Sequence, residues 1–241
     1  MLSHNQIKLI RSLKQKKSRQ SHRLFVVEGL KSIEEFSHSN YLIKEIYTVD
    51  ANIADKLGGF LISTKQMSQI SFLKTPNVVL ALVEIPLPEK FKENGLLLAL
   101  DDVSDPGNLG TIIRLCDWFG VAHLICSENT VDCYNEKVVQ ASMGSLTRVQ
   151  VHYLDLAEFI KQYNGKVFGA FMDGEVIYKQ TLPENALVIM GNEGQGISEH
   201  IEQLVQEKVC IPQFGSDKPV ESLNVATATA IILNEFRRSV Y

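Results

Sequence analysis

The sequence predicts an α/β protein whose C-terminal part is a mostly parallel sheet with helices on both faces, preceded by a smaller α/β unit. From residue 96 onward, continuous apolar runs of strand length alternate with amphipathic stretches of helical length. That alternation is typical of parallel strands covered on both faces. Residues 86–95 combine two prolines, a charge cluster and a final glycine, which is typical of a linker. The predicted domains are therefore 1–85 and 96–241.

In the first unit, Ile7, Ile10 and Leu13 are spaced as on one face of a helix, which predicts a helix over 3–17. Strands and helices then alternate, with Asp50 and Thr64 as residue types that cap helices. The elements expected in order are strand 24–29, a helix to 36, strand 41–48, helix 50–57, strand 60–62, helix 64–70 and strand 77–85.

The second unit is expected to contain strands at 96–101, 121–126, 147–152, 166–172, 186–190 and 208–211. Helices are expected at 108–119, 135–143, 155–163, 197–206 and 223–238. Repeated strand–helix–strand units place the carboxyl ends of parallel strands at one edge of the sheet.

Composition excludes several classes of protein. The chain has 241 residues, 45% apolar and 22% charged, which is ordinary for a globular protein. No apolar run reaches the length of a membrane span, and residues 1–5 carry no apolar signal core, so a cytoplasmic location is expected. The cysteines form no C-x-x-C pair and no zinc-like cluster with histidine, so reduced cysteines and no metal are expected. They are Cys116, Cys126, Cys133 and Cys210.

Charge is distributed unevenly along a chain whose net charge is −4. Residues 1–31 hold eight Lys and Arg against the single acid Glu28, so this arm is net positive and the rest is strongly acidic. A basic arm on an acidic body is typical of a contact with a phosphate backbone, although a solvated helix face would look the same.

Three short segments follow apolar strands and carry the polar and glycine residues expected at a ligand site. In an open α/β sheet, ligands bind beyond the carboxyl ends of the strands, so the three turns predict one composite site. The segments are 105–114 (DPGNLGTIIR), 190–196 (MGNEGQG) and 211–212 (IP) leading to 221–226 (ESLNVA).

Each segment also has a plainer interpretation. Arg114 lies off the buried stripe of its helix and could reach the sheet edge, or could be an ordinary surface arginine. Ser222 is the expected N-cap of the last helix, and capping alone could explain Ser222 or Asn224. The glycines are spaced G-x-x-G-x-G, which is not the dinucleotide fingerprint, and no Walker-A lysine is present. A nicotinamide oxidoreductase is therefore disfavoured.

In order and spacing, the three segments resemble motifs 1, 2 and 3 of the SpoU/TrmH family of RNA ribose 2′-O-methyltransferases, within the SPOUT superfamily. The resemblance covers residues 96–241. Residues 23–29 (RLFVVEG) are similar to the start of the auxiliary substrate-binding domain of that family, a small α/β fold akin to a ribosomal protein.

The resemblance implies a deep C-terminal trefoil knot, a homodimer and S-adenosylmethionine bound by the knotted loops. The residues at the reaction centre would be Arg114, Asn108, Glu193, Ser222 and Asn224. The methyl donor would contact Gly191, Asn192, Gly194, Ile211, Leu223 and Asn224. The basic arm would bind RNA through Lys14, Lys16, Lys17, Arg19 and Arg23.

The expected function is S-adenosylmethionine-dependent methylation of a ribose 2′-hydroxyl in structured RNA, with ribosomal RNA favoured over transfer RNA because of the auxiliary domain. The alternative is a catalytically inactive RNA-binding dimer that acts in ribosome assembly. A guanidinium stays protonated at neutral pH, so Arg114 is expected to stabilise a developing alkoxide or grip a phosphate rather than accept the proton. The loop 213–221 looks longer than is usual in the family.

Overall fold

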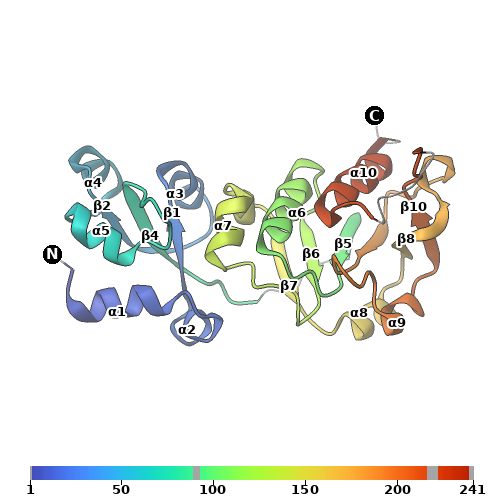
Figure 1. Ribbon diagram of the computed structural model, residues 1–241, viewed down its shortest axis with the longest axis horizontal. Coiled ribbons are helices and arrows are strands. Elements are labelled where there is room, and N and C mark those ends of the chain that lie inside the picture. Colours follow the sequence, from blue (N-terminus) through green and yellow to red (C-terminus); the bar gives the residue numbers. More distant parts are fainter. Residues whose placement is uncertain (1, 89–92, 216–221, 239–241) are drawn as a thin grey trace. The chain divides into compact units, whose positions relative to one another are not determined.

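The computed structural model describes residues 2–88, 93–215 and 222–238, which form two compact units (Figure 1). The N-terminal unit consists of Met1–Pro88 and Asp132–Arg148. The C-terminal unit consists of Glu89–Val131 and Val149–Tyr241. The segment 132–148 was expected to belong with the second domain. Its packing places it instead in the unit that the first residues build.

The N-terminal unit contains a four-stranded sheet in the order β1-β4-β2-β3. Strand β4 is antiparallel to β1 and β2, whereas β2 and β3 are parallel. The strands are β1 Leu24–Glu28, β2 Ile43–Thr48, β3 Phe60–Leu61 and β4 Val79–Glu84. The helices are α1 His4–Ser12, α2 Lys16–His22, α3 Leu30–Ser37, α4 Ala51–Leu57, α5 Thr64–Ile70 and α7 Glu136–Ser142, with the 3₁₀ turn η1 Ser145–Thr147.

The single helix predicted over 3–17 is wrong. A capping box between Ser3 and Gln6 starts α1, which ends at Ser12, and Gln15 is extended before α2 begins. The apolar spacing of the sequence did not reveal the break. Arg19 Nη1 holds the turn between the two helices by donating to the carbonyl oxygens of Leu13 and Lys14, each at 2.8 Å.

The segment 132–148 completes the core of the N-terminal unit. Helix α7 packs on β1, and the ring of Tyr134 lies 4.7 Å from the ring of Phe25, which also contacts Phe36. The hydroxyl of Tyr41 donates to the carbonyl oxygen of Leu146. A contact between residues so far apart in sequence is invisible to periodicity.

The C-terminal unit confirms the predicted mostly parallel sheet: all five strand pairings are parallel, in the order β10-β8-β9-β5-β6-β7. The strands are β5 Leu96–Leu100, β6 His123–Cys126, β7 Gln150–Tyr153, β8 Lys166–Val176, β9 Ala186–Met190 and β10 Glu207–Cys210. The helices are α6 Pro106–Trp118, α8 Leu156–Gln162, α9 Glu199–Glu202 and α10 Val225–Arg238, with the 3₁₀ turn η2 Ile177–Lys179.

Helices lie on both faces of this sheet (Figure 1). Leu97 and Ala99 face α8 and α9, while α6 and α10 pack together on the opposite face. All of β5 and β9 is buried, as their continuous apolar sequences predict. None of the four cysteines, which all lie in the described residues, forms a disulfide. Within the described residues, no helix combines the length and apolar character that a membrane crossing requires.

Candidate active site

The strand order brings the three predicted segments to one edge of the C-terminal sheet. Chain order runs outward from β5 through β6 to β7, then returns on the other side of β5, so β5 and β9 form a topological switch point. Ligand crevices form at such points, beyond the carboxyl ends of the strands. The first segment follows β5, the second follows β9, and the third leads from β10 into α10.

The second segment is a tight glycine loop. Asn192 and Gly196 exchange two backbone hydrogen bonds of 2.9 Å, and Gly196 has a φ of +73°. A Cβ on Gly191 would lie 2.1 Å from the carbonyl carbon of Gly196. Only glycine fits at position 191, because the loop folds back directly over it.

The amide of Asn192 holds this loop in shape. Its Oδ1 accepts from the N–H groups of Gly194 and Gln195, and its Nδ2 donates to the carbonyl oxygen of Asp102 at 2.7 Å. Asp102 itself has a φ of 57°, a left-handed conformation that Asp tolerates better than most residues. The side chain of Asn192 therefore ties the second segment to the end of β5.

A buried carboxylate makes a second tie between the same loops. Asp101 is 3% exposed, and its Oδ2 accepts from both the N–H and the hydroxyl of Ser198, each at 2.7 Å. Sequence reasoning missed Asp101, Asp102 and Ser198. The acid pair directly after the buried strand β5 was the available signal, because a charge at that position needs a partner.

One residue from each segment joins a chain of hydrogen bonds. Asn224 Nδ2 donates to Asn108 Oδ1 at 2.8 Å, and Asn108 Nδ2 donates to Glu193 Oε1 at 2.9 Å. Asn224 Oδ1 accepts from the backbone N–H of Ala226 and caps α10. The direction of every bond is fixed, because the cap at one end and the carboxylate at the other determine how both amides are oriented.

Glu193 ends this chain as an acceptor. Its carboxylate also accepts from the N–H groups of Ser104 and Asp105, at 3.2 and 3.1 Å. Partial burial acts to raise the pKa of Glu193, but the bonds from Asn108 and from these backbone groups outweigh it and hold the pKa below its usual value. Glu193 is therefore ionised at neutral pH, with its oxygens occupied by donors.

Beside the chain lies a cavity of about 520 Å³. Backbone of the glycine loop forms one wall, and apolar side chains from the ends of β10 and α10 form another. The central part of β8 shifts its register against β10 and contributes Ala170, Phe171 and Met172. Further lining residues are Met190, Gly191, Asn192, Gly194, Ile211, Pro212, Ser222, Leu223, Val225 and Ile232. The volume and mixed lining suit a ligand of the size of S-adenosylmethionine.

The predicted residues fall into distinct groups. Gly191, Asn192, Gly194, Ile211 and Leu223 all line the cavity, as do Ser222 and Glu193 from the predicted reaction centre. Asn224, predicted for both lists, does not line the cavity; its amide is bonded to Asn108 and to the start of α10. The prediction that Ser222 is the N-cap of α10 is wrong, because Asn224 caps this helix. Most of the loop 213–221 lies outside the described residues.

Arg114 stands apart from the chain of amides. It is exposed on α6 and is not among the residues that line the cavity. Among the described residues, its guanidinium has no hydrogen-bond partner in the structure, unlike the guanidinium of Arg237, which donates to the carbonyl oxygen of Phe119. An exposed and unengaged guanidinium remains available to an anionic ligand.

The predicted RNA-binding residues separate into exposed lysines and a buried arginine. Lys14, Lys16 and Lys17 are exposed, and Arg23 is partly exposed and donates to the carbonyl oxygen of Ile85. Arg19 is only 3% exposed and pairs with Asp132. The prediction that Arg19 contacts RNA is therefore wrong, because its guanidinium is bonded to Asp132 and to backbone carbonyl oxygens within the unit. Among the described residues, no group of His, Cys, Asp and Glu could hold a metal ion.

Comparisons with known proteins match both units. Residues 95–234 match the model of the SpoU rRNA Methylase family, and residues 4–81 match the MRM3-like substrate binding domain. The chain is 29% identical to the 23S rRNA (guanosine(2553)-2′-O)-methyltransferase RlmP of Bacillus subtilis, over 97% of this chain and 96% of that one. It is 30% identical to the 23S rRNA (guanosine-2′-O-)-methyltransferase RlmB of Neisseria meningitidis, over 80% of this chain and 76% of that one.

Two solved structures superpose on nearly the whole chain. A TrmH-family protein from Porphyromonas gingivalis superposes with a TM-score of 0.91 at 37% identity, covering 99% of both chains. An AdoMet-bound rRNA methyltransferase from Sinorhizobium meliloti superposes with a TM-score of 0.87 at 30% identity, covering 100% of this chain and 97% of that one.

Proposed function

The chain belongs to the SpoU rRNA methylase family, and from that premise we propose that it transfers a methyl group from S-adenosylmethionine to a ribose 2′-hydroxyl of structured RNA. One observation carries the proposal: Asn108, Glu193 and Asn224, one from each segment, form a single hydrogen-bonded chain beside a cavity of suitable size. Both curated relatives named above are 23S rRNA 2′-O-methyltransferases, which favours ribosomal RNA over transfer RNA.

The cavity is the proposed donor site. S-adenosylmethionine supplies a methyl group already activated by a sulfonium, so the protein has to position two reactants rather than activate the carbon. Correct positioning alone can be worth roughly 7–11 kcal/mol of barrier. Gly191 and Gly194 would present backbone groups to the donor, while Ile211 and Leu223 would enclose its apolar parts.

The amides are the proposed contacts to the RNA sugar. Each of Asn108 and Asn224 uses one N–H within the chain, and the described residues provide no acceptor for the other. These N–H groups would donate to the ribose or to its phosphate. Glu193 fixes Asn108 and is not the proton acceptor, because its pKa is lowered and its oxygens already accept several bonds.

Arg114 is the proposed electrostatic partner of the reaction. Its guanidinium keeps its proton, so it would stabilise charge developing on the 2′-oxygen or hold the adjacent phosphate. Ser222, at the cavity wall, would contact the donor or the hydroxyl.

The remaining family properties belong to the same proposal: a deep trefoil knot in the C-terminal unit, a homodimer and a cytoplasmic location. The family resemblance supports them. An inactive RNA-binding dimer is not favoured, because the amide chain and the cavity are both intact.

Nucleoside mass spectrometry of ribosomal and transfer RNA from cells with and without the gene tests the function. One 2′-O-methylated nucleotide should disappear from ribosomal RNA when the gene is absent. Calorimetry with S-adenosylmethionine and the purified protein tests the donor site. Unchanged nucleosides together with no donor binding would favour the inactive dimer.

A further inference from the structure

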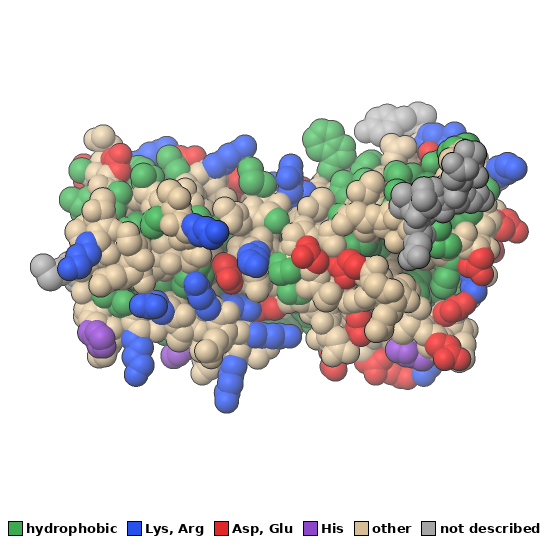
Figure 2. All heavy atoms as spheres, viewed as in Figure 1, with side chains coloured by type: hydrophobic (Ala, Val, Ile, Leu, Met, Phe, Trp, Pro, Cys, Tyr) green, Lys and Arg blue, Asp and Glu red, His purple; other side chains and the backbone are tan. Residues whose placement is uncertain are grey.

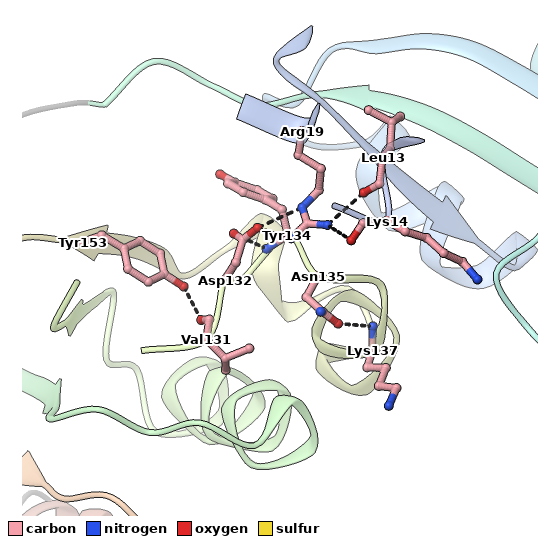
Figure 3. Close-up of polar contacts among 9 residues, drawn as sticks. All are labelled: Leu13, Lys14, Arg19, Val131, Asp132, Tyr134, Asn135, Lys137 and Tyr153. Atoms are coloured by element: carbon pink, nitrogen blue, oxygen red, sulfur yellow. Dashed lines mark hydrogen bonds and ion pairs between the residues drawn. The ribbon is translucent and has the colours of Figure 1, made fainter. Parts of the chain in front are cut away.

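Arg19 is a buried guanidinium that ties together three parts of the N-terminal unit (Figure 3). Its Nη1 donates to the carbonyl oxygens of Leu13 and Lys14, each at 2.8 Å. Its Nε and Nη2 donate to Asp132 Oδ2 at 2.8 and 2.5 Å. The other carboxylate oxygen of Asp132 accepts from the N–H of Tyr134. Four of the five guanidinium N–H groups and both carboxylate oxygens therefore have partners, and the two charges compensate each other, as a buried pair needs.

The carbonyl oxygens that Arg19 holds belong to the turn between α1 and α2. Leu13 is the C-cap of α1, and the turn continues through Lys14 and Gln15 into Lys16 and Lys17. Lys14 Nζ lies 5.0 Å from the centre of the Phe72 ring, so this lysine too is held at one place. Arg19 therefore fixes the backbone that carries three exposed lysines.

Helix α2 has little means of stabilising itself. It is seven residues long, its N-cap Gln15 makes no side-chain bond, and its first turn contains no acid. Isolated helices of this length are unstable in water. Lysines at a helix N-terminus also repel the positive end of the helix dipole. Lys17 lies in the first turn of this helix, where its charge destabilises the helix, which favours a role for that charge outside the fold.

We propose that the Arg19–Asp132 pair is a positioning device that holds the α1–α2 turn as a preformed face for RNA phosphates. Lys14, Lys16 and Lys17 would neutralise phosphates, and the exposed Gln20 and Ser21 would add neutral hydrogen bonds. Figure 2 shows Lys and Arg side chains gathered over α1 and α2. This inference rests on the proposed function only in taking RNA as the ligand.

A preformed face binds more tightly because the turn is ordered before the ligand arrives. Arg19 itself does not touch RNA, so its loss should act through the lysines. The expected signature is a weaker interaction with RNA, with the reaction centre unchanged.

The test compares full-length Arg19→Met with wild type. Anisotropy with a short labelled RNA duplex measures affinity across salt concentrations, and kinetics with unmodified 23S rRNA separates KM from kcat. Arg19→Met should bind the duplex about tenfold more weakly and raise the KM for RNA about tenfold. Its kcat and its affinity for S-adenosylmethionine should stay within about twofold of wild type, which general damage to the fold would not allow.

Glu35→Gln is the matched control. Glu35 pairs with Arg148 at 2.5 Å and also joins the segment 132–148 to the first residues, but both side chains, at 35% and 47% exposed, are much more accessible than those of Arg19 and Asp132. This variant should bind RNA as wild type does. Equal losses of RNA affinity in Glu35→Gln and Arg19→Met would overturn the proposal, because any weakening of the contacts of segment 132–148 would then lower RNA affinity.

Replacing Lys14, Lys16 and Lys17 together by Ala keeps the proposal testable if Arg19→Met fails to fold, because all three are exposed. The triple variant should lower the slope of log affinity against log salt by about 2–3. A wild-type slope, or a folded Arg19→Met with wild-type affinity, would contradict the proposal. If the wild-type protein methylates no RNA, the proposed function fails. The duplex affinities still show whether the α1–α2 turn binds RNA.

Discussion

The N-terminal unit buries an ion pair that holds its basic turn, whereas the candidate site of the C-terminal unit is held by two amides bonded to a partly exposed carboxylate. Arg19 is 3% exposed and Asp132 12% exposed. Asn108, Asn224 and Glu193 lie at a partly exposed rim, where water can replace lost bonds. The two groups should therefore respond differently to mutation: loss of the ion pair should lower the free energy of unfolding, and loss of the amide chain should lower turnover.

The largest effect is expected for Asp132→Ala. Removing the carboxylate leaves the buried Arg19 guanidinium without a counter-charge, which typically costs about 3–5 kcal/mol of unfolding free energy. Urea denaturation followed by circular dichroism measures it. The partly exposed pair of Glu35 and Arg148 should contribute only about 0–1 kcal/mol. Similar losses of unfolding free energy for Asp132→Ala and Glu35→Gln would show that the buried pair stabilises the unit no more than the partly exposed pair does.

The next effect is on turnover. Asn108→Ala removes the link between Glu193 and Asn224 and one proposed donor to the sugar, so kcat should fall by about 10²–10³, or about 2.7–4 kcal/mol. The free energy of unfolding should change by less than about 1.5 kcal/mol, because the site is partly open to water. Single-turnover kinetics and urea melts measure the two quantities. A strongly destabilised Asn108→Ala with normal turnover would reverse the assignment.

A smaller effect is expected for Arg114→Lys. The charge stays, but the planar fork that holds an oxyanion or phosphate by two bonds is lost. We expect about a tenfold lower kcat/KM, equivalent to one charge-assisted hydrogen bond. Affinity for S-adenosylmethionine should be unchanged, because Arg114 does not line the cavity. A variant as fast as wild type would exclude a geometric role for the guanidinium.

The smallest effect concerns pH and a second neutral group in the C-terminal unit. His152 Nε2 lies 3.2 Å from His123 Nδ1, and burial, with a smaller contribution from His123, lowers the pKa of His152 to about 4. In the unfolded chain the pKa is about 6.5. Between these values the unfolded state binds more protons, so stability should rise with pH from about 4 to 6.5 and then level off.

His152→Gln should flatten that rise without changing stability near pH 8. Thermal melts across this pH range measure it. An unaltered pH profile in the variant would show that other groups dominate the acid response.

Much of the fold followed from local patterns in the sequence. The buried runs Leu96–Leu100 and Ala186–Met190 became the central strands, and the glycine spacing located the loop at Gly191. What failed depended on distant partners. Arg19 looked like a surface cation because its partner Asp132 lies 113 residues away. Ser222 looked like the helix cap because nothing local shows that Asn224 is held by Asn108.

The site was predictable as residues but not as geometry. Asn108, Glu193 and Asn224 were named from their motifs, yet only the strand order explains how residues so far apart in sequence share one chain of bonds. The hydrogen bonds made by Asp101 and Asn192 could not be predicted, because each joins loops that follow two different strands.

The position of the transferred methyl group tests directly whether Asn108 and its bonded partners serve ribose methylation. Purified enzyme, unmodified ribosomal RNA and isotopically labelled S-adenosylmethionine are incubated, and the digested nucleosides are resolved by mass spectrometry. We predict label on a ribose 2′-oxygen with wild type and almost none with Asn108→Ala. Label on a base would contradict ribose methylation, and equal ribose labelling by both proteins would contradict the role of Asn108.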